Sequence, residues 1–154
     1  MQGKIFDDVI KDDTPLRKAL LYGIHGGHVN CTDGRYVYMR ACVSPENTPL
    51  YNYTLMPMHM RERFSLKELQ NTELAGPFSF SKGCKLLKAP SYGIPELNFS
   101  FYDFGNLCFD LESDPGQKNP IQDVDVEERM RGLMIELMKE NDAPAEQYIR
   151  LGLN

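Results

Sequence analysis

Two histidines bracket a glycine pair in the stretch YGIHGGHVNCTDGRYVYMR, residues 22–40, and a third, His59, lies in the methionine-rich stretch LMPMHM. A zinc site would need all three imidazoles as ligands. On a regular strand residues three apart point to opposite faces, so His25 and His28 converge only if the glycines form a bulge or a loop. The pattern also fits a backbone that passes close to a ligand while one histidine hydrogen-bonds to it. A third interpretation is that the histidines are structural.

Other residues whose side chains could bind a metal or act in catalysis have simpler interpretations. The thioethers of LMPMHM would suit a soft metal or a flexible hydrophobic surface, but they also suit packing in a core or loop. Asp103, Asp110 and Asp114 resemble paired carboxylates, yet they surround a turn, where Asp is favoured for its hydrogen bonds to the backbone. The sequence contains no glycine-rich phosphate loop and no H-E-x-x-H zinc motif.

The four cysteines are widely separated and include no C-x-x-C pair, so neither a zinc knuckle nor a redox motif is present. We expect free thiols in a reducing compartment. Cys42 begins the stretch CVSPE, which offers no adjacent His or Arg to lower the pKa of its thiol. We therefore interpret Cys42 as structural.

Composition limits the class of protein. The chain has 154 residues, 42% of them hydrophobic and 25% charged, which suits one globular domain with a core. Its formal net charge is −5 and no Lys/Arg cluster is present, so nucleic acid is not expected as a partner. No stretch approaches the roughly 20 apolar residues of a membrane helix, and the acidic start MQGKIFDDVIKDD does not resemble a signal peptide. For the chain as given we expect no membrane contact and a cytoplasmic location.

The hydrophobic pattern predicts a hairpin after a polar lead-in segment, residues 1–18. Two β-prone runs, Leu20 to Cys31 and Arg35 to Val43, are joined through Asp33-Gly34, a dipeptide that favours hairpin turns. In the second run, the period of two sets Val37, Met39 and Ala41 on one face, which we expect in the core, and Tyr36, Tyr38 and Arg40 on the other, amphipathic face.

The remaining pattern predicts further short strands and two helices. Ser65 and Glu68 form a capping box that should start a short helix ending before Gly76-Pro77. Residues 124–140 carry apolar side chains on one helical face and should be capped by Asp123 or Asp125. This apolar stripe consists of Val126, Met130, Leu133 and Leu137. We predict the other short strands near residues 51–56, 84–88, 97–101 and 106–111, and a final turn after Pro144.

These elements together predict an α+β fold. It would consist of a small, predominantly antiparallel sheet of about four strands, with the C-terminal helix packed on one face. The domain proper would comprise residues 19–154.

Two stretches resemble a known enzyme family. FDLESDPGQKNPI, residues 109–121, is similar to the (Y/F)DL-x-x-DP-x-E-x-x-N-L motif near the C-terminus of sulfatases of the alkaline-phosphatase-like superfamily. TDGRYVYMR resembles the DGRYKYI hairpin that precedes this motif, and MRGLMIELMKENDAPAEQYIRLGL resembles the terminal helix and tail of bacterial members. The resemblance extends from about residue 15 to residue 153. Gln117 and Pro120 differ from the usual Glu and Leu.

The resemblance implies a C-terminal, substrate-cleft-forming and stabilising subdomain of a sulfatase. Sulfatases hydrolyse sulfate esters with a formylglycine made from the Cys or Ser of C/S-x-P-x-R and with a bound calcium ion. CVSPE does not match that motif, and no metal or catalytic group is expected in this chain. The chain alone would be inactive, and its partner would be the catalytic N-terminal part, which carries calcium and formylglycine. For His25, His28 and His59 the resemblance implies contact with the substrate rather than catalysis.

Two alternatives remain open. In the first, the chain is a stand-alone binding module that keeps the fold and binds a sulfated small molecule, a sulfated glycan or a protein. A self-sufficient metallohydrolase built on the histidines is the other possibility. If the chain is an isolated subdomain, it should expose an apolar face and self-associate.

Overall fold

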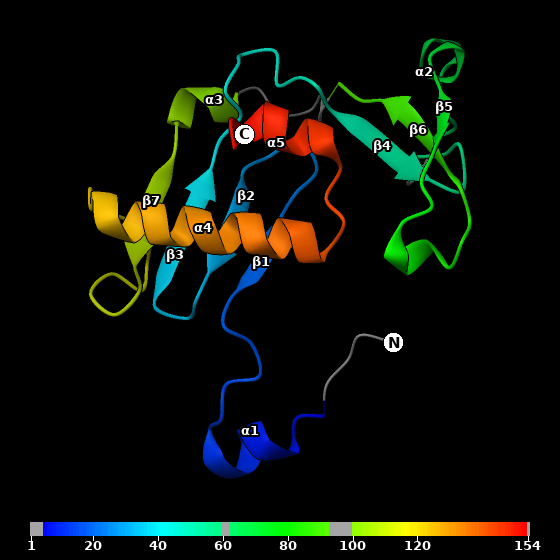
Figure 1. Ribbon diagram of the computed structural model, residues 1–154. Coiled ribbons are helices and arrows are strands. Elements are labelled where there is room, and N and C mark those ends of the chain that lie inside the picture. Colours follow the sequence, from blue (N-terminus) through cyan, green and yellow to red (C-terminus); the bar gives the residue numbers. More distant parts are fainter. Residues whose placement is uncertain (1–4, 60–61, 93–99, 154) are drawn as a thin grey trace.

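The computed structural model describes residues 5–59, 62–92 and 100–153 and has the predicted α+β fold (Figure 1). The first sheet has the strand order β1-β2-β3-β7, and the second has the order β4-β6-β5. The strands are β1 Leu20–Gly23, β2 Val29–Thr32, β3 Tyr36–Arg40, β4 Tyr51–Thr54, β5 Glu73–Ala75, β6 Leu86–Pro90 and β7 Leu107–Asp110. The α-helices are α1 Asp7–Asp12, α2 Leu66–Gln70, α3 Phe101–Phe104, α4 Val124–Glu140 and α5 Ala145–Leu151, and a 3₁₀ turn, η1, spans Ser79–Ser81.

The first sheet is antiparallel throughout, and the Asp33-Gly34 hairpin between β2 and β3 is confirmed. The Asp33 carboxylate accepts hydrogen bonds from the backbone N–H groups of Arg35 and Tyr36, at 3.0 and 2.7 Å, and so fixes the turn. The prediction of one continuous run from Leu20 to Cys31 is wrong. The Gly26-Gly27 pair breaks it into the two strands β1 and β2, which pair with each other.

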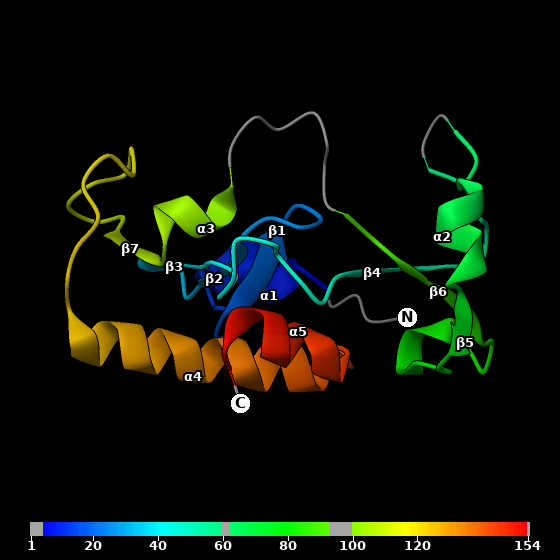
Figure 2. The ribbon, with the colours of Figure 1, turned by 90° about the horizontal axis from the view of Figure 1, so that it is seen from above.

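Helix α4 covers one face of this sheet, as predicted, and its bounds are the predicted ones. Its N-cap is Asp123, whose side chain accepts from the backbone N–H of Val126 at 3.1 Å. The buried stripe is shifted from the predicted one. Met130 is buried as predicted, and the other two buried positions of the helix are Met134 and Met138. They pack on the sheet residues Cys31, Tyr38 and Cys108. Figure 2 shows α4 and α5 on this side of the sheet and α3 on the opposite side.

Both faces of strand β3 contribute buried side chains. Val37 is buried on the face predicted to form the core, with 2% of its surface exposed. Tyr38 is equally buried on the other face, under α4. The face that we predicted as amphipathic therefore forms the main core, because α4 packs on the tyrosine side of the strand.

The second sheet is part of an insertion between β3 and β7, and its size was not predicted. The insertion, residues 50–92, contains β4, α2, β5, η1 and β6 and lies to one side of the first sheet (Figure 1). The capping box of α2 is confirmed, since Ser65 and Glu68 bond each other's backbone N–H groups. The insertion is linked to α5 through Glu146, which accepts from the Tyr53 hydroxyl and pairs with Lys88 at 3.4 Å.

The predictions for the short elements had mixed outcomes. The strands expected near residues 51–56, 84–88 and 106–111 are present as β4, β6 and β7 with small shifts. Of the strand expected at residues 97–101, positions 97–99 lie outside the described residues, and Phe101 begins helix α3 instead. The lead-in segment contains the short helix α1, which lies away from both sheets (Figure 1). Within the described residues no helix has the length and apolar character needed to cross a bilayer.

Candidate functional site

The loop between β1 and β2 carries His25 and His28 at one end of the first sheet. It is closed by a hydrogen bond from the Gly27 N–H to the Ile24 carbonyl, at 3.0 Å. Gly26 has a φ of 73°, which side-chain-bearing residues rarely adopt. A Cβ on Gly27 would lie 2.8 Å from the Ile24 side chain. The glycine pair is therefore required for this tight loop. The sequence was compatible with either a bulge or a loop at this point, and the structure has the loop.

His25 lies at the exposed side of the loop. Its Nε2 is 2.8 Å from the hydroxyl oxygen of Ser91, which follows β6. Partial burial, and then the positive charge of Arg150 and a smaller repulsion from His59, lower the pKa of His25 below its ordinary value. At neutral pH the imidazole is thus uncharged and can act as a hydrogen-bond donor or acceptor toward a hydroxyl group.

His28 is buried on the other side of the loop, with 9% of its surface exposed. Its Nε2 donates to the Gly105 carbonyl at 2.8 Å, and its ring meets the Phe101 ring edge to face at 5.3 Å. Together with side chains of the first sheet it lines a hollow of about 410 Å³. The hollow is lined by Tyr22, Gly23, Ile24, His28, Asn30, Met39 and Phe101. Within the described part of the chain, Asn30 Oδ1 is the single buried side-chain N or O atom without a hydrogen-bond partner.

His59 belongs to the insertion and is not part of this loop. Its Nε2 is 2.8 Å from a carboxylate oxygen of Glu68, and its ring lies 4.7 Å from that of Phe64. The structure therefore brings His25 and His28 into one loop, while each of the three histidines has a different polar partner. Among residues 5–59, 62–92 and 100–153, no three His, Cys, Asp or Glu side chains form a group suited to a metal ion.

Arg150 of α5 holds the histidine loop in place, and sequence reasoning did not find it. The guanidinium is buried, with 2% of the residue exposed, and donates to the Gly27 carbonyl at 3.3 Å and to Asn47 Oδ1 at 2.9 Å. Asn47 in turn donates to the Gly26 carbonyl at 2.6 Å. Burial lowers the pKa of Arg150, and no ion pair links it to a carboxylate in the described segments. Because these contacts span more than 100 positions of sequence, no local pattern could have predicted them.

The aspartates and cysteines have structural surroundings. Asp114 accepts from the backbone N–H groups of Lys118 and Asn119, both at 2.7 Å, and so organises the loop after β7. Asp110 pairs with Arg35. The four cysteines are free, and Cys84 is the exposed one. Burial raises the pKa of Cys31 and of Cys108 to about 11, so these thiols stay protonated at neutral pH.

This end of the sheet thus offers a neutral imidazole, a serine hydroxyl and a tight glycine loop, which together are suited to hydrogen-bonding a polar ligand. Comparison of the chain with protein-family models, curated proteins and solved structures gives no match.

Proposed function

We propose that this chain is the C-terminal, substrate-cleft-forming subdomain of a sulfatase. The observation that carries the proposal is the pairing of β3 with β7, because each strand contains part of one of the two sulfatase-like stretches. Arg35 of DGRYVYMR and Asp110 of FDLESDP form a salt bridge at 2.9 Å across this pairing. Arg35 and Asp110 are 75 positions apart along the chain, so the two stretches form one structural unit, as expected if both belong to one family pattern.

The sheet face opposite α4 supports the proposal that a catalytic part packs there. Leu20, Tyr22 and Ile24 are 43%, 43% and 56% exposed along its edge. The unpartnered oxygen of Asn30 lies at the hollow on the same face. Exposed apolar side chains and an unsatisfied buried acceptor are both expected where a covering segment belongs. An isolated chain would instead use this face for self-association.

The histidine loop would then form one wall of the substrate cleft. The formylglycine and the calcium ion would belong to the catalytic part and would supply the nucleophile and neutralise the sulfate charge. His25, as a neutral imidazole beside Ser91, would hydrogen-bond to a hydroxyl of the substrate, and His28 would shape the apolar side of the loop. Arg150 would act as a positioning residue that fixes the loop from behind. His59 would contact the substrate only where a long substrate reaches the insertion.

The test is sulfate release by the native polypeptide that carries this sequence. Antibodies against the exposed segment GQKNP, residues 116–120, would capture that polypeptide from its source under native conditions. We expect the captured polypeptide to release inorganic sulfate from at least one member of a panel of aryl and sugar sulfate esters. The 154-residue chain alone should release none. A folded captured polypeptide that cleaves no member of the panel would contradict the proposal.

The second candidate function is a stand-alone module that binds a sulfated ligand or a protein without turnover. The positive charge of the insertion favours it, since six basic and three acidic residues lie within residues 50–92. Under this alternative the native polypeptide has the length of the present chain and binds its ligand without sulfate release.

A further inference from the structure

Charge is divided unequally between the insertion and the rest of the chain. Residues 50–92 contain six Lys/Arg and three Glu, a net charge of +3. The remaining residues contain eleven Lys/Arg and nineteen Asp/Glu, a net charge of −8. The overall charge of −5 is therefore the sum of a basic insertion and an acidic remainder of the chain. A polyanion approaching the molecule would be attracted to the insertion and repelled elsewhere.

The acidic groups of the insertion are mostly engaged with its own residues. Glu68 accepts from the Ser65 N–H and hydroxyl at 2.7 Å and lies beside His59, and Glu73 pairs with Lys88 at 3.1 Å. In contrast, four basic side chains of the insertion are exposed and form no ion pair within the described segments. These are Arg63, Lys67, Lys82 and Lys85.

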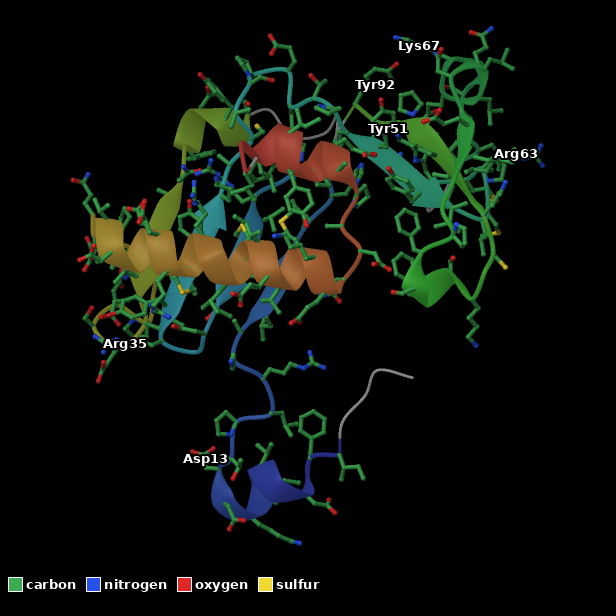
Figure 3. The ribbon with its side chains drawn as sticks, in the orientation of Figure 1. Asp13, Arg35, Tyr51, Arg63, Lys67 and Tyr92 are labelled. Carbon is green, nitrogen blue, oxygen red and sulfur yellow. The ribbon has the colours of Figure 1, made fainter. Side chains whose placement is uncertain are left out.

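Aromatic rings lie beside two of the ammonium groups of the insertion. Lys67 Nζ is 4.8 Å from the centre of the Tyr92 ring, and Lys88 Nζ is 4.3 Å from that of Tyr51. Tyr92 is 64% exposed. Figure 3 shows Lys67, Tyr92 and Tyr51 along one side of the insertion, with Arg63 on its outer side. An exposed ring next to an ammonium group presents a flat apolar surface and a positive charge together.

We propose that the insertion is an accessory binding surface for a sulfated polysaccharide. Lys67 would contact a sulfate group and the Tyr92 ring would stack on the sugar beside it, while Arg63, on the outer side of the insertion, would contact a sulfate group farther along the polymer. This inference rests on the proposed function, because an enzyme that acts on sulfate esters would bind a sulfated polymer rather than another polyanion. Lysine binds sulfate as a point charge and arginine can bind it with two parallel hydrogen bonds. The surface lies outside the histidine loop, so it would hold a distant part of a long substrate.

The test is binding of fluorescent dextran sulfate to the purified 154-residue chain, measured by anisotropy over a range of salt concentrations. Neutral dextran of similar length tests whether binding needs charge, and polyuridylic acid of similar length tests whether a phosphate polyanion binds as well as a sulfated one. We expect dextran sulfate to bind most tightly, with an affinity that falls steeply with salt, and neutral dextran not to bind. The double variant Lys67→Gln/Arg63→Gln should weaken binding about tenfold or more and flatten the salt dependence.

Matched variants separate a specific surface from a general charge effect. The double variant Lys139→Gln/Arg131→Gln removes the same two positive charges from exposed positions of α4 and should leave the affinity for dextran sulfate within about twofold. Tyr92→Ala should weaken binding while leaving its salt dependence unchanged, because stacking releases no counterions. Equal losses in the α4 variants, equal binding of neutral dextran, or preference for polyuridylic acid would overturn the proposal.

The two proposals fail separately. If the chain does not bind dextran sulfate but the native polypeptide releases sulfate from small esters, the accessory surface is wrong and the sulfatase function stands. If the chain binds dextran sulfate through the insertion but no sulfate is released by the native polypeptide, the surface stands as that of a binding module and the sulfatase function is wrong.

Discussion

Arg35, the residue before β3, and Asp110, the last residue of β7, form a two-point contact. Arg35 Nη2 donates to Asp110 Oδ2 at 2.9 Å, and Nε donates to Oδ1 at 3.3 Å. Arg35 also pairs with Glu112 at 3.2 Å. The hydrogen bond from Arg35 holds the pKa of Asp110 below its ordinary value. The stretches TDGRYVYMR and FDLESDPGQKNPI are therefore joined by side chains as well as by the backbone ladder.

The first prediction concerns this pair. Arg35→Gln and Asp110→Asn should each lower the free energy of unfolding, and the double variant should lose less than the sum of the two. Asn keeps the Oδ1 acceptor used by the Glu112 N–H, so the comparison isolates the charge. Urea unfolding of the four proteins at low and high salt measures the coupling. We expect it to shrink in high salt, and strictly additive losses would show that the pair does not stabilise the fold.

The second prediction concerns the core under α4. Met134 is fully buried against the first sheet, so Met134→Ala should lower the free energy of unfolding by about 2–5 kcal/mol through lost burial and a cavity. Met134→Leu keeps the volume and should cost less than about 1.5 kcal/mol. Glu136→Ala, at an exposed position of the same helix, is the surface control. Equal, small losses in all three variants would contradict the packing of α4 described above.

The third prediction tests the role of Arg150. Arg150→Met preserves much of the shape but leaves Asn47 Oδ1 and the Gly27 carbonyl without their donor, which should cost about 1–3 kcal/mol. The amide of Gly27 should also exchange with solvent deuterium faster, because the loop loses its support. Unchanged exchange at Gly27, together with unchanged stability, would show that Arg150 does not position the loop.

The fourth prediction follows from the lowered pKa of His25. In the unfolded chain this imidazole binds a proton at its ordinary pKa of 6.5, whereas the folded protein resists protonation. Below pH 6.5 the unfolded state thus binds more protons, and stability falls as the pH falls through this value. His25→Gln should lose less stability than the wild type between pH 7.5 and 5.5 in urea unfolding. An identical pH dependence of the two proteins would show that protonation of His25 does not cause the loss of stability.

Local sequence signals predicted the parts of the fold that local chemistry determines. The Asp33-Gly34 turn, the Ser65 capping box and helix α4 were found because a few neighbouring residues fix each of them. The split of β1 from β2 was missed because residues 20–31 were treated as one β-prone run, although the glycine pair within it was compatible with either a bulge or a loop. Strand β5 was missed because its three residues carry no detectable period.

The candidate site was predicted only in part. His25 and His28 were identified from their spacing around the glycine pair, and the structure brings them into one loop. Their partners Ser91, Gly105 and Arg150 come from distant positions, and such contacts arise from tertiary packing that no short stretch encodes. The basic character of the insertion was hidden by the net charge of the whole chain. A count of charge by segment would have revealed it.

Mass spectrometry of the native polypeptide captured through residues 116–120 tests directly whether this chain is part of a sulfatase. The sulfatase account predicts a chain several-fold longer than 154 residues that yields both the FDLESDPGQKNP peptide and a C-x-P-x-R or S-x-P-x-R peptide with formylglycine at its first position. A captured chain of the present length, with no such peptide, would contradict the account and leave a stand-alone binding module.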